Sequence, residues 1–195
     1  SIDITDDAHD VTISWSLLGP PKSGKNMLIK YHPYRISLLH NLFANSKSRN
    51  PQIGIDNEKT PATEITVDMR NNLLWKFGSG TVVAKGAWAN VVNNYYSKSG
   101  GPIRVRTKGR AYVSGNVVHN SSADINRVGK ESAPFPAAPV DTTDAATAAC
   151  RVFHGVGVRP LDIIDQGLLK SIALPGCGTQ GGVPSVQITA PASDS

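Results

Sequence analysis

One short pattern recurs four times between residues 35 and 118, and it constrains the fold more than any other feature of the chain. Each copy alternates apolar and polar residues and then stops at an asparagine, at Asn41, Asn72, Asn94 and Asn116. These markers are 31, 22 and 22 residues apart, and a period in the twenties is typical of solenoid proteins. The alternation favours a short strand, and asparagine suits the following turn because it tolerates left-handed backbone.

If the copies lie one above another, the four asparagines form a ladder inside the stack. The residues two positions after each asparagine would then align as an apolar column beside the ladder: Phe43, Leu74, Tyr96 and Val118. We therefore predict an all-β protein, a right-handed parallel β-helix whose coils span residues 1–120.

A second strand in each coil carries the positive charge. The four segments are 27–30, 51–54, 81–85 and 103–106. Equal positions in successive coils lie about 4.8 Å apart, so basic residues that are distant in the sequence can line one groove. The candidate groove residues are Lys30, Lys85, Arg104 and Arg106. Such a groove suits an extended polyanion, although a solvated face accounts for these residues equally well.

Length and charge narrow the class of protein further. The 195 residues suffice for about one domain. No apolar run approaches the ~18 residues that a membrane helix needs, so we expect no membrane partner. Lys and Arg number 20 against 15 Asp and Glu, and the resulting net charge of +5 favours an anionic partner without naming one.

After residue 120 the repeat ends, and residues 121–195 differ in composition. Residues 132–140 are rich in Pro and Ala and predict an extended strap along the outside of the solenoid. Helices are predicted over residues 142–153 and 159–173. We expect these helices to cover the carboxy-terminal end of the stack.

The two cysteines, Cys150 and Cys177, fall in this carboxy-terminal part. They form either one disulfide in an oxidising compartment or two buried thiols, and the sequence leaves that choice open. The residues from Gly178 onward are expected to be a loose tail.

At the amino terminus the chain already follows the solenoid pattern. Residues 11–15 alternate as a strand does, and no cap precedes them. An uncapped coil exposes an open sheet edge, so we expect either residues upstream of Ser1 or self-association with another chain to cover it. The acidic residues before this strand fit a turn better than a cation site, because they lack the spacing of a metal loop: Asp3, Asp6, Asp7 and Asp10.

Residues 19–26 come close to a phosphate-binding loop, with two glycines and Lys25 at the right spacing. However, Asn26 stands where a Ser or Thr would bind magnesium, and the next segment is strand-like and interrupted by Pro33 where a helix is needed. Nucleotide binding is therefore excluded, and Lys25 needs another role.

Residues 34–53 carry the most specific motif. A strand ends in His40-Asn41 and is followed by Ser48-Arg49-Asn50-Pro51. This segment resembles the core signature of the family 1 polysaccharide lyases, the pectate lyases. The resemblance extends through residues 25–29 and 93–96, covers about the first 120 residues, and corresponds to the carboxy-terminal part of such a lyase.

The resemblance implies calcium-assisted β-elimination of polygalacturonate, the pectin backbone, to unsaturated oligogalacturonides. In these lyases calcium bridges the uronate carboxylate to the protein and acidifies the C5 hydrogen, an arginine removes that proton, and the oxygen at C4 departs. By its place in the Ser-Arg-x-Pro motif, Arg49 is the expected proton abstractor. Lys25 is the expected contact to the substrate carboxylate, and the family also implies a secreted protein.

Arginine is an unusual base because its side chain ordinarily stays protonated in proteins. A second interpretation keeps Arg49 charged, so that it stabilises the carbanion while water or hydroxide removes the proton. A third interpretation is structural: Arg49 braces the turn before Pro51, and Lys25 is a solvated loop lysine.

Two departures from the family pattern leave other functions open. Gly54 occupies the place where many of these lyases have a second arginine, and the family's calcium ligands lie in coils that would precede Ser1. No residue is therefore assigned as a metal ligand. The alternative function is a non-catalytic binder of acidic polysaccharide, whereas nucleic-acid binding is disfavoured because the groove strands lack interleaved aromatic residues.

Overall fold

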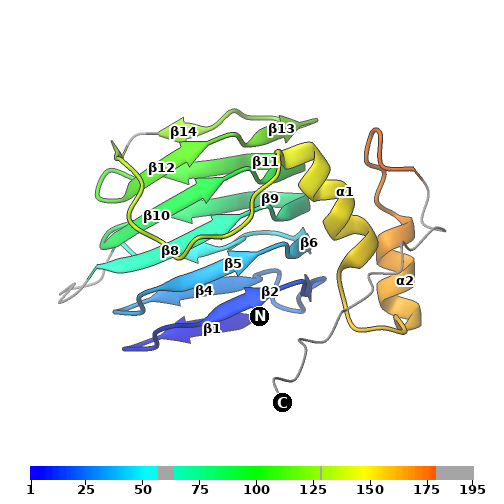
Figure 1. Cartoon of the computed structure of the whole chain (residues 1–195), viewed down its shortest axis with the longest axis horizontal. Coiled ribbons are helices and arrows are strands. Elements are labelled where there is room, and N and C mark those ends of the chain that lie inside the picture. The colour runs from blue at the N-terminus through cyan, green and yellow to red at the C-terminus, as the bar shows by residue number, and fades with distance from the viewer. Residues whose placement is uncertain (57–63, 128, 179–195) are drawn as a thin grey trace, which may run out of the picture.

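The computed structural model describes residues 1–56, 64–127 and 129–178. It is a parallel β-helix in which successive turns of the chain stack along one axis, with two short helices beside the stack (Figure 1). The predicted fold class is confirmed. The tail predicted after Gly178 lies outside the described residues.

Each complete turn of the chain crosses three faces of the stack. Face 1 contains β1 (Ile2–Thr5), β4 (Met27–Lys30), β7 (Gln52–Ile53), the second half of β9 (Leu73–Val83), the second half of β11 (Tyr95–Val105) and β14 (Asn126–Arg127). Face 2 contains β2 (Thr12–Ser14), β5 (Ile36–Leu39), β8 (Ile65–Arg70), β10 (Ala87–Val92), β12 (Arg110–Ser114) and β15 (Lys130–Glu131). Face 3 contains β3 (Leu17–Leu18), β6 (Leu42–Ser46), the first halves of β9 and β11, and β13 (Val117–His119).

The third face corrects the prediction of two strands per coil. β9 and β11 are each 11 residues long, and they continue from face 3 onto face 1 without interruption. They join these two faces into one nine-stranded sheet, while face 2 is a separate six-stranded sheet. The apolar residues after each ladder asparagine therefore belong to strands of their own.

Neighbouring strands on all three faces pair in parallel, and their register aligns the repeats as predicted. Phe43 is opposite Leu74, Leu74 is opposite Tyr96, and Tyr96 is opposite Val118. The first three of these side chains are buried completely inside the coil. The apolar column is confirmed.

The asparagine ladder is also present, at the turn between faces 2 and 3. The side-chain amide of Asn41 donates to Asn72 at 3.1 Å, Asn72 donates to Asn94 at 2.9 Å, and Asn94 donates to Asn116 at 3.0 Å. Each acceptor oxygen also receives the backbone N–H of the asparagine one turn earlier, at 2.9 Å in all three cases. The ladder thus satisfies buried polar groups that a turn would otherwise leave without partners.

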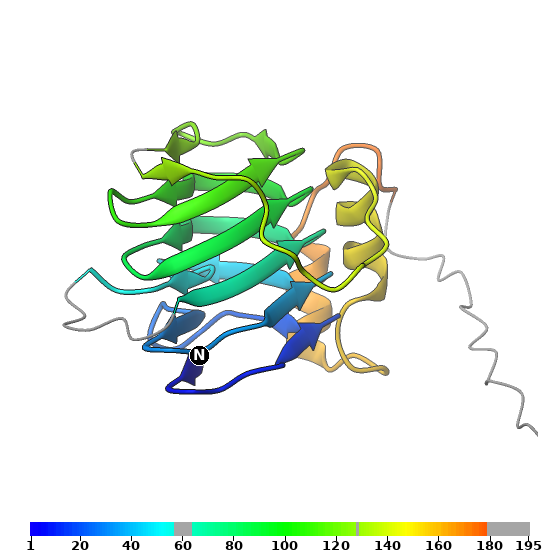
Figure 2. The same ribbon diagram turned by 60° about the vertical axis from the view of Figure 1, so that its left-hand side comes forward.

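The segment between β15 and α1 runs as a strap over the outside of face 2, as predicted (Figure 2). Its anchor is Asn90 of β10, whose side chain donates to the carbonyl of Phe135 at 3.1 Å and accepts from its N–H at 3.2 Å. The Phe135 ring meets Trp88 edge to face at 5.6 Å between centroids. A second anchor is Asn71, which bonds in both directions with the backbone of Thr143.

The helices α1 (Ala145–Gly155) and α2 (Ile163–Lys170) lie against the flank of the solenoid rather than over its carboxy-terminal end (Figure 1). The outer side of face 3 is apolar, with Leu42, Leu73 and Trp75 buried, and α1 and α2 pack on it through Val152 and Leu169. The end-capping prediction was wrong because this face exposes an apolar surface that needs a cover.

Local sequence sets the helix ends, and a disulfide fixes the flank. The α1 N-cap is Asp144, and its carboxylate accepts the N–H of Thr147. Asp162 caps α2 in the same way. Cys150 of α1 and Cys177 are joined, which answers the question that the sequence left open.

At the amino-terminal end, β1, β2 and β3 are edge strands within the described residues, each paired with one neighbour. Trp15, between β2 and β3, stacks on His40 with 4.7 Å between ring centroids and 4° between planes. The carbonyl of Trp15 accepts the N–H of Gly157 at 3.0 Å, which ties this turn to the end of α1. Burial and, to a lesser extent, the charge of Arg151 lower the pKa of His40.

We expect the ladder to be a major source of stability. Asn72→Ala should lower the free energy of unfolding by about 2–4 kcal/mol, because it leaves several buried donors and acceptors without partners. Asn116→Ala, at the less buried end of the ladder, should cost less, and the exposed Asn126→Ala should cost under about 0.5 kcal/mol. Urea unfolding measures all three, and equal effects of Asn72→Ala and Asn126→Ala would contradict this role.

The lowered pKa of His40 predicts that stability decreases on acidification. Between the folded pKa and the ordinary value near 6.5, the unfolded chain binds a proton that the folded chain does not, so the free energy of unfolding falls as pH is lowered through this window. Urea unfolding at pH 7.5 and at about pH 5.5 should show this decrease. His40→Gln should reduce the pH dependence, and an unchanged slope in that variant would disprove the assignment.

Candidate functional site

Lys25 and Arg49 lie on neighbouring turns of the chain, at the corner where face 3 leads into face 1. Lys25 forms an isolated parallel bridge with Ser48, and the carbonyl of Arg49 accepts the N–H of Met27 at 2.8 Å. The two residues of the lyase-like motifs, 24 positions apart in the sequence, are therefore diagonal neighbours in space. We call this region the Lys25–Arg49 corner.

An internal pair of asparagines fixes the backbone of this corner. The side chain of Asn26 donates to Asn50 at 2.7 Å, and the same oxygen of Asn50 accepts the hydroxyl of Ser46 at 2.8 Å. The amide of Asn50 donates to the carbonyl of Ser79, one turn further, at 2.8 Å. This second asparagine pair was not predicted, because its two members are not part of the recurring strand pattern.

The inward asparagines place the two cations on the outside. Lys25 directly precedes Asn26, Arg49 directly precedes Asn50, and both asparagines are buried. Lys25 is exposed and Arg49 is half-buried, with a left-handed φ of 63°. Within the described part of the chain neither forms an ion pair, so their charges are available to an anionic ligand.

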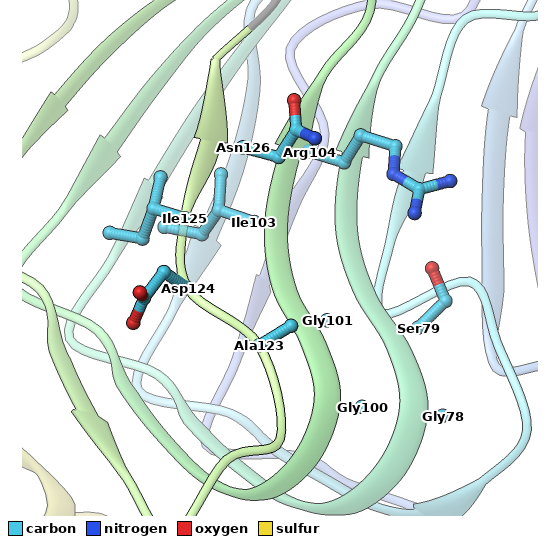
Figure 3. Close-up of a pocket in the computed structure, with 10 residues that line it drawn as sticks. All are labelled: Gly78, Ser79, Gly100, Gly101, Ile103, Arg104, Ala123, Asp124, Ile125 and Asn126. Atoms are coloured by element: carbon cyan, nitrogen blue, oxygen red, sulfur yellow. The ribbon is translucent and has the colours of Figure 1, made fainter.

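A hollow of about 600 Å³ lies on the later turns (Figure 3), and its lining residue Ser79 is hydrogen-bonded to Lys47 and Asn50 on the turn that carries Arg49. The backbone of Ser79 connects this hollow to the neighbouring turns. Its N–H donates to the carbonyl of Lys47, next to Ser48 on the previous turn, and Gly101 lies opposite Ser79 on the following turn. Gly78 and Gly100 form the floor, and a Cβ at either position would come within 2.5 Å of a carbonyl oxygen on the adjacent turn. The floor is therefore bare backbone.

Arg104 is the exposed cation of this hollow. Figure 3 shows its side chain reaching across the neighbouring strand on the side where Ser79 lies. It also lines a second hollow of about 430 Å³ together with Arg106 and Lys108. Of the four candidate groove residues, Arg104 is thus the one that the structure places beside the hollow next to the Lys25–Arg49 corner.

The other three candidate groove residues lie further apart from one another: Lys30, Lys85 and Arg106. Arg106 forms an ion pair with Asp56 at 2.5 Å. Lys30 lies 4.6 Å from the ring centre of Tyr31, and the register puts it three strands from Arg106 in the same row, about 14 Å away.

The continuous basic groove that we expected along face 1 is therefore interrupted. The register places Ala84, not Lys85, opposite Arg106. The rows of Arg104 and Arg106 contain the buried residues Val82 and Ala84 on β9 and directly after it. Strand register, which the sequence did not reveal, separates these cations.

Gly54 cannot simply be replaced by the second arginine of the lyase pattern. Its φ is 75°, a conformation that favours glycine, and a Cβ would lie 2.5 Å from the carbonyl oxygen of Lys85. Substrate contacts at this place would have to come from other residues.

Possible calcium ligands do not gather near these cations. Within residues 1–56, 64–127 and 129–178, no group of three His, Cys, Asp or Glu side chains is arranged to hold a metal ion. Asp10 is instead held by Arg35 at 2.5 Å, and this pairing, with His9 beside it, lowers the pKa of Asp10. The carboxylates described here do not fit a calcium site.

The sequence reading missed a separate set of lysines on the face 3 side of the corner. Lys76 and Lys98 each follow a ladder asparagine by four residues, and they repeat with the same 22-residue spacing as Asn72 and Asn94. The period of the ladder was the signal that could have identified them.

Neither helix among the described residues is long and apolar enough to cross a membrane. A scan against models of protein families gave no match, and a search of curated proteins gave no match either.

Proposed function

We propose that this chain acts on polygalacturonate as a pectate lyase, cleaving the polymer by β-elimination. The observation that carries the proposal is the Lys25–Arg49 corner, where the cations of two lyase-like motifs occupy adjacent turns, and a hollow floored by backbone begins one turn later. The resemblance to family 1 polysaccharide lyases supplies the reaction, and the parallel β-helix is the fold that this resemblance implies.

The chemistry requires positive charge beside the substrate carboxylate. Removal of the C5 proton leaves its electron pair delocalised towards the C5 carboxylate. That pair then forms the double bond between C4 and C5, the bond from C4 to the glycosidic oxygen breaks, and the departing oxygen takes the bonding pair and a proton from water. We assign Lys25 to the carboxylate, where its ammonium stabilises the negative charge that accumulates. Arg49 either accepts the C5 proton or remains charged and stabilises the carbanion while water or hydroxide accepts it.

Calcium remains a prediction from the family resemblance. The described carboxylates do not fit a calcium site, so our mechanism gives the charge stabilisation to Lys25 and Arg49 alone. Extended substrate would contact Arg104 next, with Lys30, Lys85 and Arg106 as more distant candidates.

Secretion is part of the proposal. The Cys150–Cys177 disulfide supports it, because such bonds persist in oxidising compartments and are rare in the cytosol. Self-association through the edge strands β1, β2 and β3 remains a prediction.

A second candidate function is non-catalytic binding of acidic polysaccharide. Two observations favour it: position 54 disfavours a side chain, and the described acidic residues are not arranged around a metal. A protein of this kind would hold the polymer at the Lys25–Arg49 corner without cleaving it.

Cleavage is tested by mixing the protein with polygalacturonate at alkaline pH, with and without calcium, and following the ultraviolet absorbance of the unsaturated product. Arg49→Ala should lower the rate by at least about 100-fold, because it removes either the proton acceptor or a charge that stabilises the transition state. Arg151→Gln, an exposed arginine of α1 outside the corner, serves as the control and should retain activity. Binding of the polymer without any product would favour the non-catalytic function, and full activity of Arg49→Ala would exclude the proposed site.

A further inference from the structure

Four lysines line a hollow of about 630 Å³ that adjoins the Lys25–Arg49 corner but is lined by neither Lys25 nor Arg49. It lies between the turn that precedes β4 and the outer bend of β6, β9 and β11. The lysines are Lys22, Lys47, Lys76 and Lys98, and all four are exposed. No Asp or Glu is among the residues that line this hollow.

The fold holds these lysines in a defined row. Trp75 is opposite Ser97 and Phe77 is opposite Ser99, so the intervening Lys76 and Lys98 lie about one strand spacing apart. The backbone of both lysines has a left-handed conformation, with φ of 51° at Lys76 and 52° at Lys98. The left-handed backbone at each position bends the strand, while the residues on either side stay buried.

The neighbouring side chains are also positioned by packing. A Cβ at Gly24 would lie about 3.0 Å from the methylene groups of Lys47, so the Lys47 side chain runs directly over this glycine. The ammonium of Lys98 lies 4.6 Å from the ring centre of the buried Trp75. These contacts hold the charged ends near a common surface.

Another hollow, of about 730 Å³ and adjacent to the one just described, extends the positive surface towards α2. Lys98 lines both hollows, and the second adds Lys170 and His119, again without any Asp or Glu. We call Lys22, Lys47, Lys76, Lys98 and Lys170 the lysine band. It crosses successive turns along the axis of the solenoid and ends at α2.

The charge of the lysine band is not neutralised by ion pairs, in contrast to the charge of several arginines. Ion pairs hold four arginines of the chain: Arg35, Arg70, Arg106 and Arg110. None of the band lysines has such a partner within the part of the chain that the structure describes. Like charges one strand spacing apart repel each other, so a bound polyanion would relieve an unfavourable interaction.

We propose that the lysine band is a second binding site for acidic polysaccharide, separate from the Lys25–Arg49 corner. The proposal rests on the substrate class proposed above and adds a site that holds the carboxylates of the polymer. Lysine ammonium groups are compact point charges that bind carboxylates approaching from many directions, which suits a flexible polymer.

The aromatic residues argue against a nucleic acid as the occupant. Trp75, Phe77 and Phe153, at or beneath the two hollows, are 1%, 5% and 4% exposed. Single-stranded nucleic acids bind by stacking bases on exposed aromatic rings, and these buried rings offer no such platform.

The test compares the affinity of charge variants for polygalacturonate by calorimetry. All proteins are full-length chains with Arg49→Ala, so that the polymer is not consumed during titration. Lys76→Gln/Lys98→Gln should bind about tenfold more weakly at low salt and show a weaker salt dependence, because two exposed charge contacts are lost. The matched control, Arg35→Gln/Arg159→Gln, also removes two exposed charges but lies outside the band and should bind as the parent does.

Lys76→Arg/Lys98→Arg, which retains both charges, should keep the parent affinity and so separates a charge effect from misfolding. The site is disproved if Lys76→Gln/Lys98→Gln binds the polymer as tightly as the Arg49→Ala parent, or if the control pair loses as much affinity as the glutamine pair. It is also disproved if the parent does not bind the polymer, or if the parent binds single-stranded DNA more tightly than the polymer at equal salt. The lyase proposal fails independently. An inactive wild type, together with band-dependent binding in the Arg49→Ala chains, excludes cleavage alone. An active wild type, together with binding that is indifferent to the band, excludes the band alone.

Discussion

The parallel register of successive turns is the constraint on which the rest of the structure depends, and buried asparagine amides hold it. Asn41, Asn72 and Asn94 each donate to the asparagine side chain of the next turn, and every ladder asparagine accepts a backbone N–H from the previous turn. A slip of one residue would turn every inward side chain outward, so these bonds decide which residues reach the surface. The pair Asn26 and Asn50 does the same at the Lys25–Arg49 corner, where it leaves the preceding cations outside.

The three faces of the solenoid are treated differently by the rest of the chain. The strap crosses face 2, and α1 and α2 cover the apolar outer side of face 3, where the disulfide holds α1 to the segment after α2. Covering these surfaces removes apolar side chains from water, which is the main driving force for such packing. The corner between faces 3 and 1 keeps its hollows, and the unpaired cations border them.

The two kinds of basic residue play different parts at this surface. Several arginines are fixed by carboxylates, as Arg70 is by Asp68, and they contribute to structure more than to a field that attracts ligands. The lysines of the band and the Lys25–Arg49 corner lack such partners in the described residues, so their charge remains available to an anionic ligand. An extended acidic polymer has the charge and the length to use both places.

The sequence by itself determined the stacked repeat, because its period, its alternating strands and its asparagines are local signals that every turn repeats. It therefore predicted the ladder and the apolar column. Only the tertiary structure decided the third face, the flank position of the helices, the Cys150–Cys177 pairing and the separation of Lys85 from the row of Arg106. These depend on the bend of strands β9 and β11, on which outer face is apolar, and on strand register, and each of these arises from contacts between residues far apart in the chain.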